Sequence, residues 1–565
     1  MLPNKLLQLA LVAALAASPS LLIAQDMPGM PGMEHHHHDD APTDLEKLGH
    51  VHFPVSCAAK TQGQFERGIA LLHSFGYVEA ERQFRTLTAS DPNCAMAHWG
   101  VAMSQFHELW GRPDAPSMKT GADEMTRAES LAGTTKITPR EHAYIDALNG
   151  FFTEAPKDFQ TAADQYAASM KALHAAYPDD IEGAAFYALA VIASEAPDDT
   201  SLNKERIALA VLMPLFRAHP EHPGLAHYII HTCDTPSLAA QGLEAAKVYA
   251  AIAPSSPHAL HMPGHIFARL GMWPEDIQSN LASVAASEKA EAAGQPGVAH
   301  QMHADEFLIY AYLQVGEDEK ARTLTSKMQA IGQHVDSMPG MDDMKGSGPW
   351  FTNEMNAIYL LEMHDWKAAE KLKPEAKSPQ SATVDITWAN GIAAGHLHNA
   401  KVAKKSLAVI DTEIDKLRNG PQAYRIPGSM VGRNEIAGWA AYAEDKPDEA
   451  IDLLRKAADQ QDKLGQSEVD IPAREMLGDL LMALHRPKDA LVEYKVALVL
   501  SPNRLNGLLS AGQAAEAAGD KKAEALYYTA AARNTHNALD SKRPQLLYAV
   551  NFAAHESATQ GTPAE

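Results

Sequence analysis

A spacing of thirty-four residues recurs in the middle of this chain and constrains its fold more than any other feature. His227 and His231 form a pair four residues apart, and His261 and His265 repeat that pair one spacing later. The prolines that precede the two pairs have the same spacing. Such a period is typical of solenoids, in which one supersecondary unit is stacked many times. Residues four apart lie on one face of a helix, so the pattern predicts stacked helices with histidines on a common face.

The best-defined repeat spans residues 471–504. It carries small residues where two helices approach, an aromatic residue between them and a proline after the second helix; these are Leu477, Gly478, Leu481, Ala490, Tyr494, Ala497 and Pro502. Residues 61–94, 431–464 and 505–538 carry the same pattern in part. The pattern closely resembles the tetratricopeptide repeat family. The resemblance implies an all-α fold, a TPR-like solenoid of helix–turn–helix units wound into a right-handed superhelix.

The histidine pairs set the frame of the central repeats. Two units follow one another over 223–290, and a third spans 302–335. The whole array is expected over 57–555, and a flexible tail over 556–565.

Two neighbouring segments carry signals of their own. Residues 111–137 do not fit the repeat, and we expect an irregular insertion there. Thr138 and Glu141 form a capping-box pattern, with Pro139 at the first helical position. This combination predicts a helix that begins after Thr138.

The N-terminus, residues 1–24, has the features of a secretory signal peptide. Lys5 supplies a positive charge, the residues up to Ala24 are almost wholly apolar, and cleavage there would leave Gln25 first. An uncleaved signal anchor is the alternative. No second apolar run of that length follows, so we expect a periplasmic or secreted chain with no transmembrane segment after cleavage.

Residues 25–56 are predicted to be a disordered leader that is rich in methionine and histidine. Its prolines and glycines oppose regular structure, and it contains four consecutive histidines: His35, His36, His37 and His38. Thioethers suit Cu(I), and imidazoles suit copper, zinc or nickel. The four histidines are therefore weaker candidates for metal binding, and a solvated low-complexity segment is the alternative interpretation.

The net charge of −23 limits the class of partner. Nucleic acids are bound by cationic side chains that displace counterions from the phosphates, so we expect no nucleic acid partner. The tetratricopeptide resemblance implies instead a protein or peptide in the concave groove of the superhelix.

The chain contains three cysteines, of which two are expected to pair. Cys57 and Cys94 each precede the first helix of one of two consecutive repeats, so they can be neighbours. An oxidising compartment favours a disulfide between them. Two buried, reduced cysteines are the alternative.

The central histidines form the candidate metal site. In the tetratricopeptide frame, three consecutive first helices present to the groove His227, His231, His258, His261, His265, His303 and Glu306. Adjacent helices pack about 8–10 Å apart, so imidazoles from neighbouring repeats can meet at one ion, with copper or zinc expected. Three or four ligands suffice, and the others can orient them. Cys233 points away from this face and is a weaker candidate.

Pro263 leaves an alternative open at this site. It lacks the N–H group that a helix interior requires, so the helix can kink there or begin there. In the second case His258 and His261 lie in a loop. Independently of the proline, histidines in a tetratricopeptide groove can bind a peptide carboxylate or hydrogen-bond one another instead of a metal.

The sequence contains none of the usual hydrolase, phosphate-binding or dinucleotide-binding motifs. The leading hypothesis is therefore an exported TPR repeat protein that acts as a protein- or peptide-binding scaffold and holds a transition metal ion in its groove. A metal-dependent hydrolase or oxidase, with Glu306 as general base, is one alternative. A pure scaffold without metal is the other.

Overall fold

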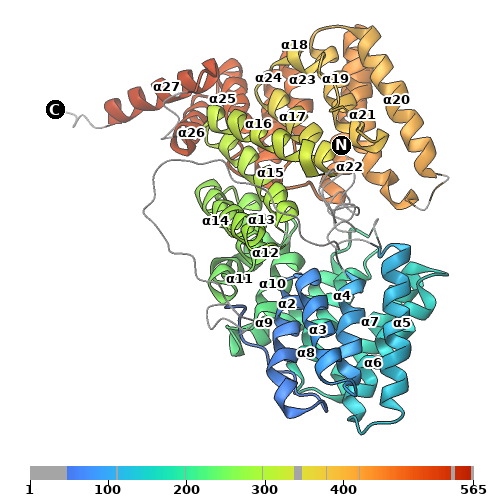
Figure 1. The fold of residues 1–565 in the computed structure, drawn as a ribbon. Helices are drawn as coiled ribbons and strands as arrows, with labels where there is room; N and C mark the ends of the chain where they lie inside the picture. The colour runs from blue at the N-terminus through green and yellow to red at the C-terminus, as the bar shows by residue number, and fades with distance from the viewer. Residues whose placement is uncertain are drawn as a thin grey trace.

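The computed structural model describes residues 47–560 except 108, 110, 111, 197, 198, 296, 336–346, 377, 419, 421 and 536–540. Within this part of the chain every regular element is a helix, and each helix packs against its neighbours in the sequence (Figure 1). The predicted all-α solenoid of helix–turn–helix units is therefore confirmed.

The N-terminal helices occupy the lower part of the view in Figure 1. They are η2 (Ala59–Thr61), α2 (Gln62–His73), α3 (Tyr77–Ser90), α4 (Ala95–Phe106), α5 (Ala115–Ala132), α6 (Pro139–Glu154), α7 (Phe159–Ala176), α8 (Ile181–Ala193) and α9 (Asn203–Ala218). The central helices are α10 (Pro223–Cys233), α11 (Ala239–Ile252), α12 (Pro257–His261), α13 (Pro263–Arg269), α14 (Trp273–Ala292), α15 (Val298–Gln314) and α16 (Asp318–Val335).

The C-terminal helices complete the array. They are α17 (Ser347–Glu362), α18 (Trp366–Ala369), η4 (Gln380–Thr383), α19 (Val384–His396), α20 (Ala400–Arg418), η5 (Ala423–Arg425), α21 (Ile426–Ala443), α22 (Pro447–Leu464), α23 (Ala473–Ala483), α24 (Pro487–Leu500), α25 (Leu505–Ala518), α26 (Lys521–Asn534) and α27 (Pro544–Gln560). Among the described residues, no helix has both the length and the apolar character needed to cross a membrane.

The glycines of the repeat pattern let the two helices of a hairpin approach closely. A methyl group at Gly478 would lie 2.5 Å from the ring of Tyr494, and one at Gly512 would lie 2.5 Å from the ring of Tyr528. Each ring therefore fills the space that the missing side chain leaves. An added carbon there would overpack the hairpin, which costs about 1–3 kcal/mol.

The start of α6 agrees with the sequence signal. Thr138 accepts a hydrogen bond from the backbone N–H of Glu141, and Glu141 accepts one from the backbone N–H of Thr138, so the capping box is confirmed. The segment 111–137 contains α5, so the expected irregular insertion was wrong. The small and polar residues of α5 conceal an amphipathic helix that buries Met125 and Ala128.

Two predicted boundaries also differ from the structure. Residues 47–56, assigned to the disordered leader, pack on the array, and Phe53 is fully buried against Phe65. Residues 556–560, assigned to the tail, continue α27. The remaining leader residues, the signal segment and residues 561–565 lie outside the described part of the chain.

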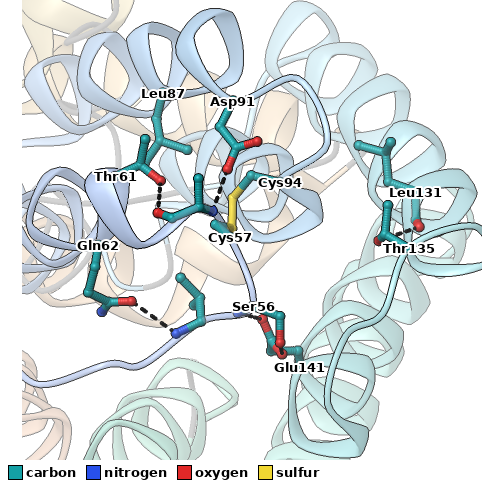
Figure 2. The surroundings of a disulfide bond; sticks show 12 residues. Ser56, Cys57, Thr61, Gln62, Leu87, Asp91, Cys94, Leu131, Thr135 and Glu141 are labelled. Atoms are coloured by element: carbon teal, nitrogen blue, oxygen red, sulfur yellow. Dashed lines mark hydrogen bonds between the residues drawn. A yellow bond between two sulfur atoms is a disulfide. The ribbon is translucent and has the colours of Figure 1, made fainter.

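A disulfide bond anchors the segment before α2. Cys57 and Cys94 are joined, with their Cα atoms 4.8 Å apart. Next to it, Asp91 accepts a hydrogen bond from the backbone N–H of Ala58, and Glu141 accepts two from Ser56 (Figure 2). The start of the array is thus tied to both α4 and α6.

The C-terminal repeats fold back onto the central ones. Trp273 donates to the carbonyl of Asn503, and Arg504 donates to the hydroxyl of Tyr310 and to Glu362. Arg269 in turn donates to the carbonyl of Gln466. These contacts join residues 142 to 230 positions apart and place the loop before α23 over α13.

Candidate metal centre

The helices that carry the central histidines begin in the same way. Pro223 and Pro257 occupy the first positions of α10 and α12, and in each case the residue before the proline accepts a hydrogen bond from a backbone N–H of the first turn. This shared start keeps the thirty-four-residue spacing in register. His227, His258, His261 and His265 are at most 3% exposed.

Pro263 interrupts the helix without displacing the histidines. Met262 joins α12 to α13 with helical backbone angles, φ −54° and ψ −35°. His258 and His261 therefore lie in a short helix of their own rather than in a loop. The Nε2 atoms of His261 and His265 come within 2.9 Å of each other.

His261, His265 and His303 form one group, called here the second triad. Each offers a ring nitrogen, and these nitrogens all lie within 4.8 Å of one another. His261 directs its Nδ1 at the Oδ1 atom of Asn280, 2.6 Å away. The ring of Phe307 contacts all three imidazoles, with centroid distances of 4.8, 4.8 and 5.5 Å.

Neutral rings alone cannot supply all the hydrogen-bond donors that His261 and His265 need. Asn280 donates its amide to Asp276, so its oxygen accepts from Nδ1–H of His261. Nδ1 of His265 faces carboxylate oxygens, and it must donate as well. A neutral imidazole carries one N–H, so two neutral rings would face each other with bare lone pairs at Nε2. Either an extra proton or a cation must lie between them.

Carboxylates determine where an extra proton resides when no cation is bound. Nδ1 of His265 lies 3.0 Å from Asp234 and 3.1 Å from Glu468. Burial lowers the pKa of His265, but these two carboxylates outweigh it and raise the pKa to about 10. Arg269 bonds to both carboxylates and compensates part of their charge.

His227, His231 and His258 form the first triad, and their ring nitrogens also lie within 4.8 Å of one another. Nδ1–H of His227 donates to the carbonyl of His73 at 2.6 Å, which leaves its Nε2 bare, 3.0 Å from Nε2 of His258. Nε2 of His231 is buried and has no hydrogen-bond partner among the described residues.

Burial keeps most of these imidazoles neutral. It lowers the pKa of His231 to about 3 and that of His303 to about 3, and it holds the pKa values of His227, His258 and His261 well below their usual range. A neutral imidazole is the form that coordinates a metal.

The other predicted site residues belong to neither triad. Glu306 lies beside the second triad and hydrogen-bonds Nδ1 of His303 at 2.7 Å, so it orients a ring, and it belongs to none of the candidate metal groups formed by the described residues. Cys233 is buried in the hydrophobic core and belongs to none of the candidate metal groups formed by the described residues. His35, His36, His37 and His38 lie outside the described residues.

Several residues of the centre were not predicted from the sequence. They are His300, whose ring lies 5.8 Å from that of His258, and the outer partners Asn280, Asp234 and Glu468. Glu468 is 203 positions from His265. The repeat frame gives no signal for such a contact, although Asn280 lies on the second helix of the same hairpin.

The surroundings differ from an open groove. The segment that contains Glu468 and Gln466 lies against α13, where Glu468 contacts His265 of the second triad. The side chain of His303, in the same triad, is 17% exposed.

A further buried cluster lies beside the first triad and is fully hydrogen-bonded. Glu182 accepts from Nε2–H of His73 at 2.6 Å and from Nε2–H of His222 at 3.0 Å. Tyr228 donates to Nδ1 of His73, and the backbone N–H of Leu225 donates to Nδ1 of His222. We call these residues the Glu182 network. Neutral rings satisfy every one of these contacts.

Comparison with known proteins adds little to this geometry. No family model matches the chain, and no curated protein matches it. Solved structures with some likeness include a human IFIT1 dimer with m7Gppp-AAAA, at 12% identity over 78% of this chain and 90% of that one, with a TM-score of 0.36. Another is yeast Tom70, at 11% identity over 89% and 96%, with a TM-score of 0.31.

A third is the TPR domain of P58(IPK), at 13% identity over 68% of this chain and 100% of that one, with a TM-score of 0.21. The assignment of the fold rests on the packing of consecutive hairpins in the chain itself.

Proposed function

We propose that this protein binds a transition metal ion through its central histidines, within a helical-repeat scaffold. One observation carries the proposal: Nε2 of His261 and Nε2 of His265 face each other at 2.9 Å, while Nδ1 of each ring is directed at an oxygen acceptor. When a cation replaces the extra proton on His265, two lone pairs aim at one point. This arrangement, with outer partners that fix the ring orientation, is typical of histidine metal ligands.

The distances fit a metal after a small adjustment. Zinc and similar ions bind imidazole nitrogen at about 2.0–2.1 Å, so two ligand nitrogens of a tetrahedral site lie about 3.3 Å apart. The two Nε2 atoms need to separate by only about 0.4 Å to admit an ion between them. Imidazole ligands suit zinc and copper, and these are the proposed metals.

Export and partner binding complete the proposal. The apolar N-terminus and the Cys57–Cys94 disulfide support a periplasmic or secreted location. A protein or peptide partner stays a prediction.

Metal binding is best tested on the full-length chain with the leader histidines silenced (His35→Asn, His36→Asn, His37→Asn and His38→Asn). After chelation, the protein is dialysed against Zn²⁺ or Cu²⁺, and bound metal and unfolding are measured. We expect retained metal and stabilisation of about 2.7 kcal/mol per site when free metal is 100-fold above Kd. The control adds His261→Ala and His265→Ala, which should remove much of both effects. A silenced chain that retains no Zn or Cu above background rules the proposal out.

A further inference from the structure

The two triads stand apart as two separate sets of ligands. The ring nitrogens of the first triad converge within 4.8 Å, and so do those of the second, but among the described residues no candidate group mixes members of the two. The rings of His258 and His261, one from each triad, have centroids 6.2 Å apart. The triads are therefore neighbours that converge on different points.

Each triad also has its own apolar neighbour. The ring of Phe75 contacts all three imidazoles of the first triad, with centroid distances of 4.4, 5.2 and 5.6 Å. Phe307 has the same place in the second triad, at 4.8, 4.8 and 5.5 Å. An apolar shell of this kind limits solvent access to a metal ion. The arrangement of three imidazoles with one phenyl ring thus occurs twice.

We propose that the centre holds two transition metal ions side by side, one in each triad, with three imidazole ligands apiece. This inference rests on the proposed function, because it presupposes that the histidines bind metal. Three protein ligands leave a coordination position open on a tetrahedral ion. Adjacent ions with open positions can hold one small ligand, such as water or hydroxide, between them.

The two ions have unequal surroundings. In the second triad, His265 contacts Asp234 and Glu468, and His303 contacts Glu306. In the first triad, the acceptor for Nδ1–H of His227 is the neutral carbonyl of His73. Carboxylate partners strengthen imidazole as a ligand, and outer partners change metal affinity by about 10- to 100-fold. The second triad therefore binds a divalent ion more tightly and fills first.

The test counts ions in the full-length chain with silenced leader histidines. After equilibrium dialysis against Co²⁺ or Zn²⁺, we expect two ions per chain. His231→Ala and His303→Ala should each leave one ion, and the remaining ion should be held at least about 10-fold more tightly in the His231→Ala chain. His219→Ala is the matched control because His219 is exposed near the centre, and it should leave both ions.

The number of bound ions distinguishes a failure of the two-ion centre from a failure of metal binding itself. One ion per chain, lost with either substitution, would overturn the two-ion centre and keep the metal-binding function. No ion at all would overturn both.

A spectroscopic measurement on the chain with both triads intact covers the case in which a variant does not fold. One equivalent of Cu²⁺ should give the electron paramagnetic resonance signal of an isolated ion. A second equivalent should broaden or weaken that signal through coupling. If the signal of two equivalents is simply twice that of one isolated ion, without coupling, the two sites are not neighbours.

Discussion

The Glu182 network and the second triad are both buried groups of histidines with carboxylates, yet their hydrogen bonds balance differently. In the network, neutral His73 and His222 satisfy every hydrogen bond described above around Glu182. In the second triad, neutral His261 and His265 would oppose two lone pairs. Proximity of histidines is thus weak evidence for a metal. The count of donors and acceptors shows that the second triad needs an extra proton or a cation, whereas the Glu182 network needs neither.

Loss of the disulfide should cause the largest loss of stability. It should affect the N-terminal repeats, next to the Glu182 network, and not the second triad. The Cys57–Cys94 bond closes a 37-residue separation next to α2, the helix that ends at His73. On the chain-entropy relation, its loss destabilises the N-terminal repeats by about 4 kcal/mol. Denaturant unfolding of the oxidised chain and of the Cys57→Ser/Cys94→Ser chain measures the loss.

Metal binding by the second triad provides the control for this experiment. It should be unchanged, because α13 and α15 are anchored by other contacts. Equal denaturation midpoints for the two chains would show that the bond does not constrain the unfolded state.

Glu182→Gln should give the next largest effect. One carboxylate accepts from both His73 and His222, whereas the amide group of glutamine would direct its own N–H groups at one of them. Breaking a buried charged network costs about 3–5 kcal/mol, and we expect about 3 kcal/mol because one acceptor is retained. Glu244→Gln, on the exposed face of α11, is the control. A loss below about 1 kcal/mol would mean that the network contributes little.

Asn280→Ala should weaken metal binding by the second triad more than it reduces folding stability, unlike Glu182→Gln. The substitution removes the acceptor that orients His261. We expect metal affinity of the second triad to fall about 10-fold and stability to fall by about 1 kcal/mol. Gln278→Ala, exposed on the same helix, is the control. If metal affinity is the same in both variants, Asn280 does not orient a ligand.

The smallest expected effect is the pH dependence of the stability difference between wild type and Glu182→Gln, which tests the charge state assigned to the Glu182 network. Burial alone would raise the pKa of Glu182, but attraction to His222 and His73 outweighs it and holds the pKa well below the usual value. Because the pKa of Glu182 is lower in the folded chain than in the unfolded chain, its ionised carboxylate stabilises the fold at pH values above the unfolded pKa, near 4.5. That stabilisation is lost as the pH falls towards the folded pKa. The difference between wild type and Glu182→Gln should therefore be constant from pH 7 to 5 and shrink by up to about 1.4 kcal/mol per pH unit below 4.5. Denaturant titrations of the metal-free chains measure it, and a difference that grows in acid contradicts the assignment.

The fold and part of the centre were predictable because their causes are local. The glycine and aromatic positions of 471–504 determine how two helices approach. The four-residue spacing of His261 and His265 puts both rings on one face, because Met262 keeps helical backbone angles where Pro263 interrupts the helix. The insertion at 111–137 was mispredicted because small and polar residues hid the apolar face of α5.

The sequence by itself therefore determined the repeating helices, the face on which the central histidines lie and the neighbouring positions of Cys57 and Cys94. Only the tertiary structure decided that six of these histidines divide into two triads, that Glu306 orients a ring, and that Glu468 reaches His265 across 203 positions. The reason is that helices follow from the chemistry of a few adjacent residues. The closure of the superhelix instead accumulates from a small rotation at every repeat, and no single repeat encodes it.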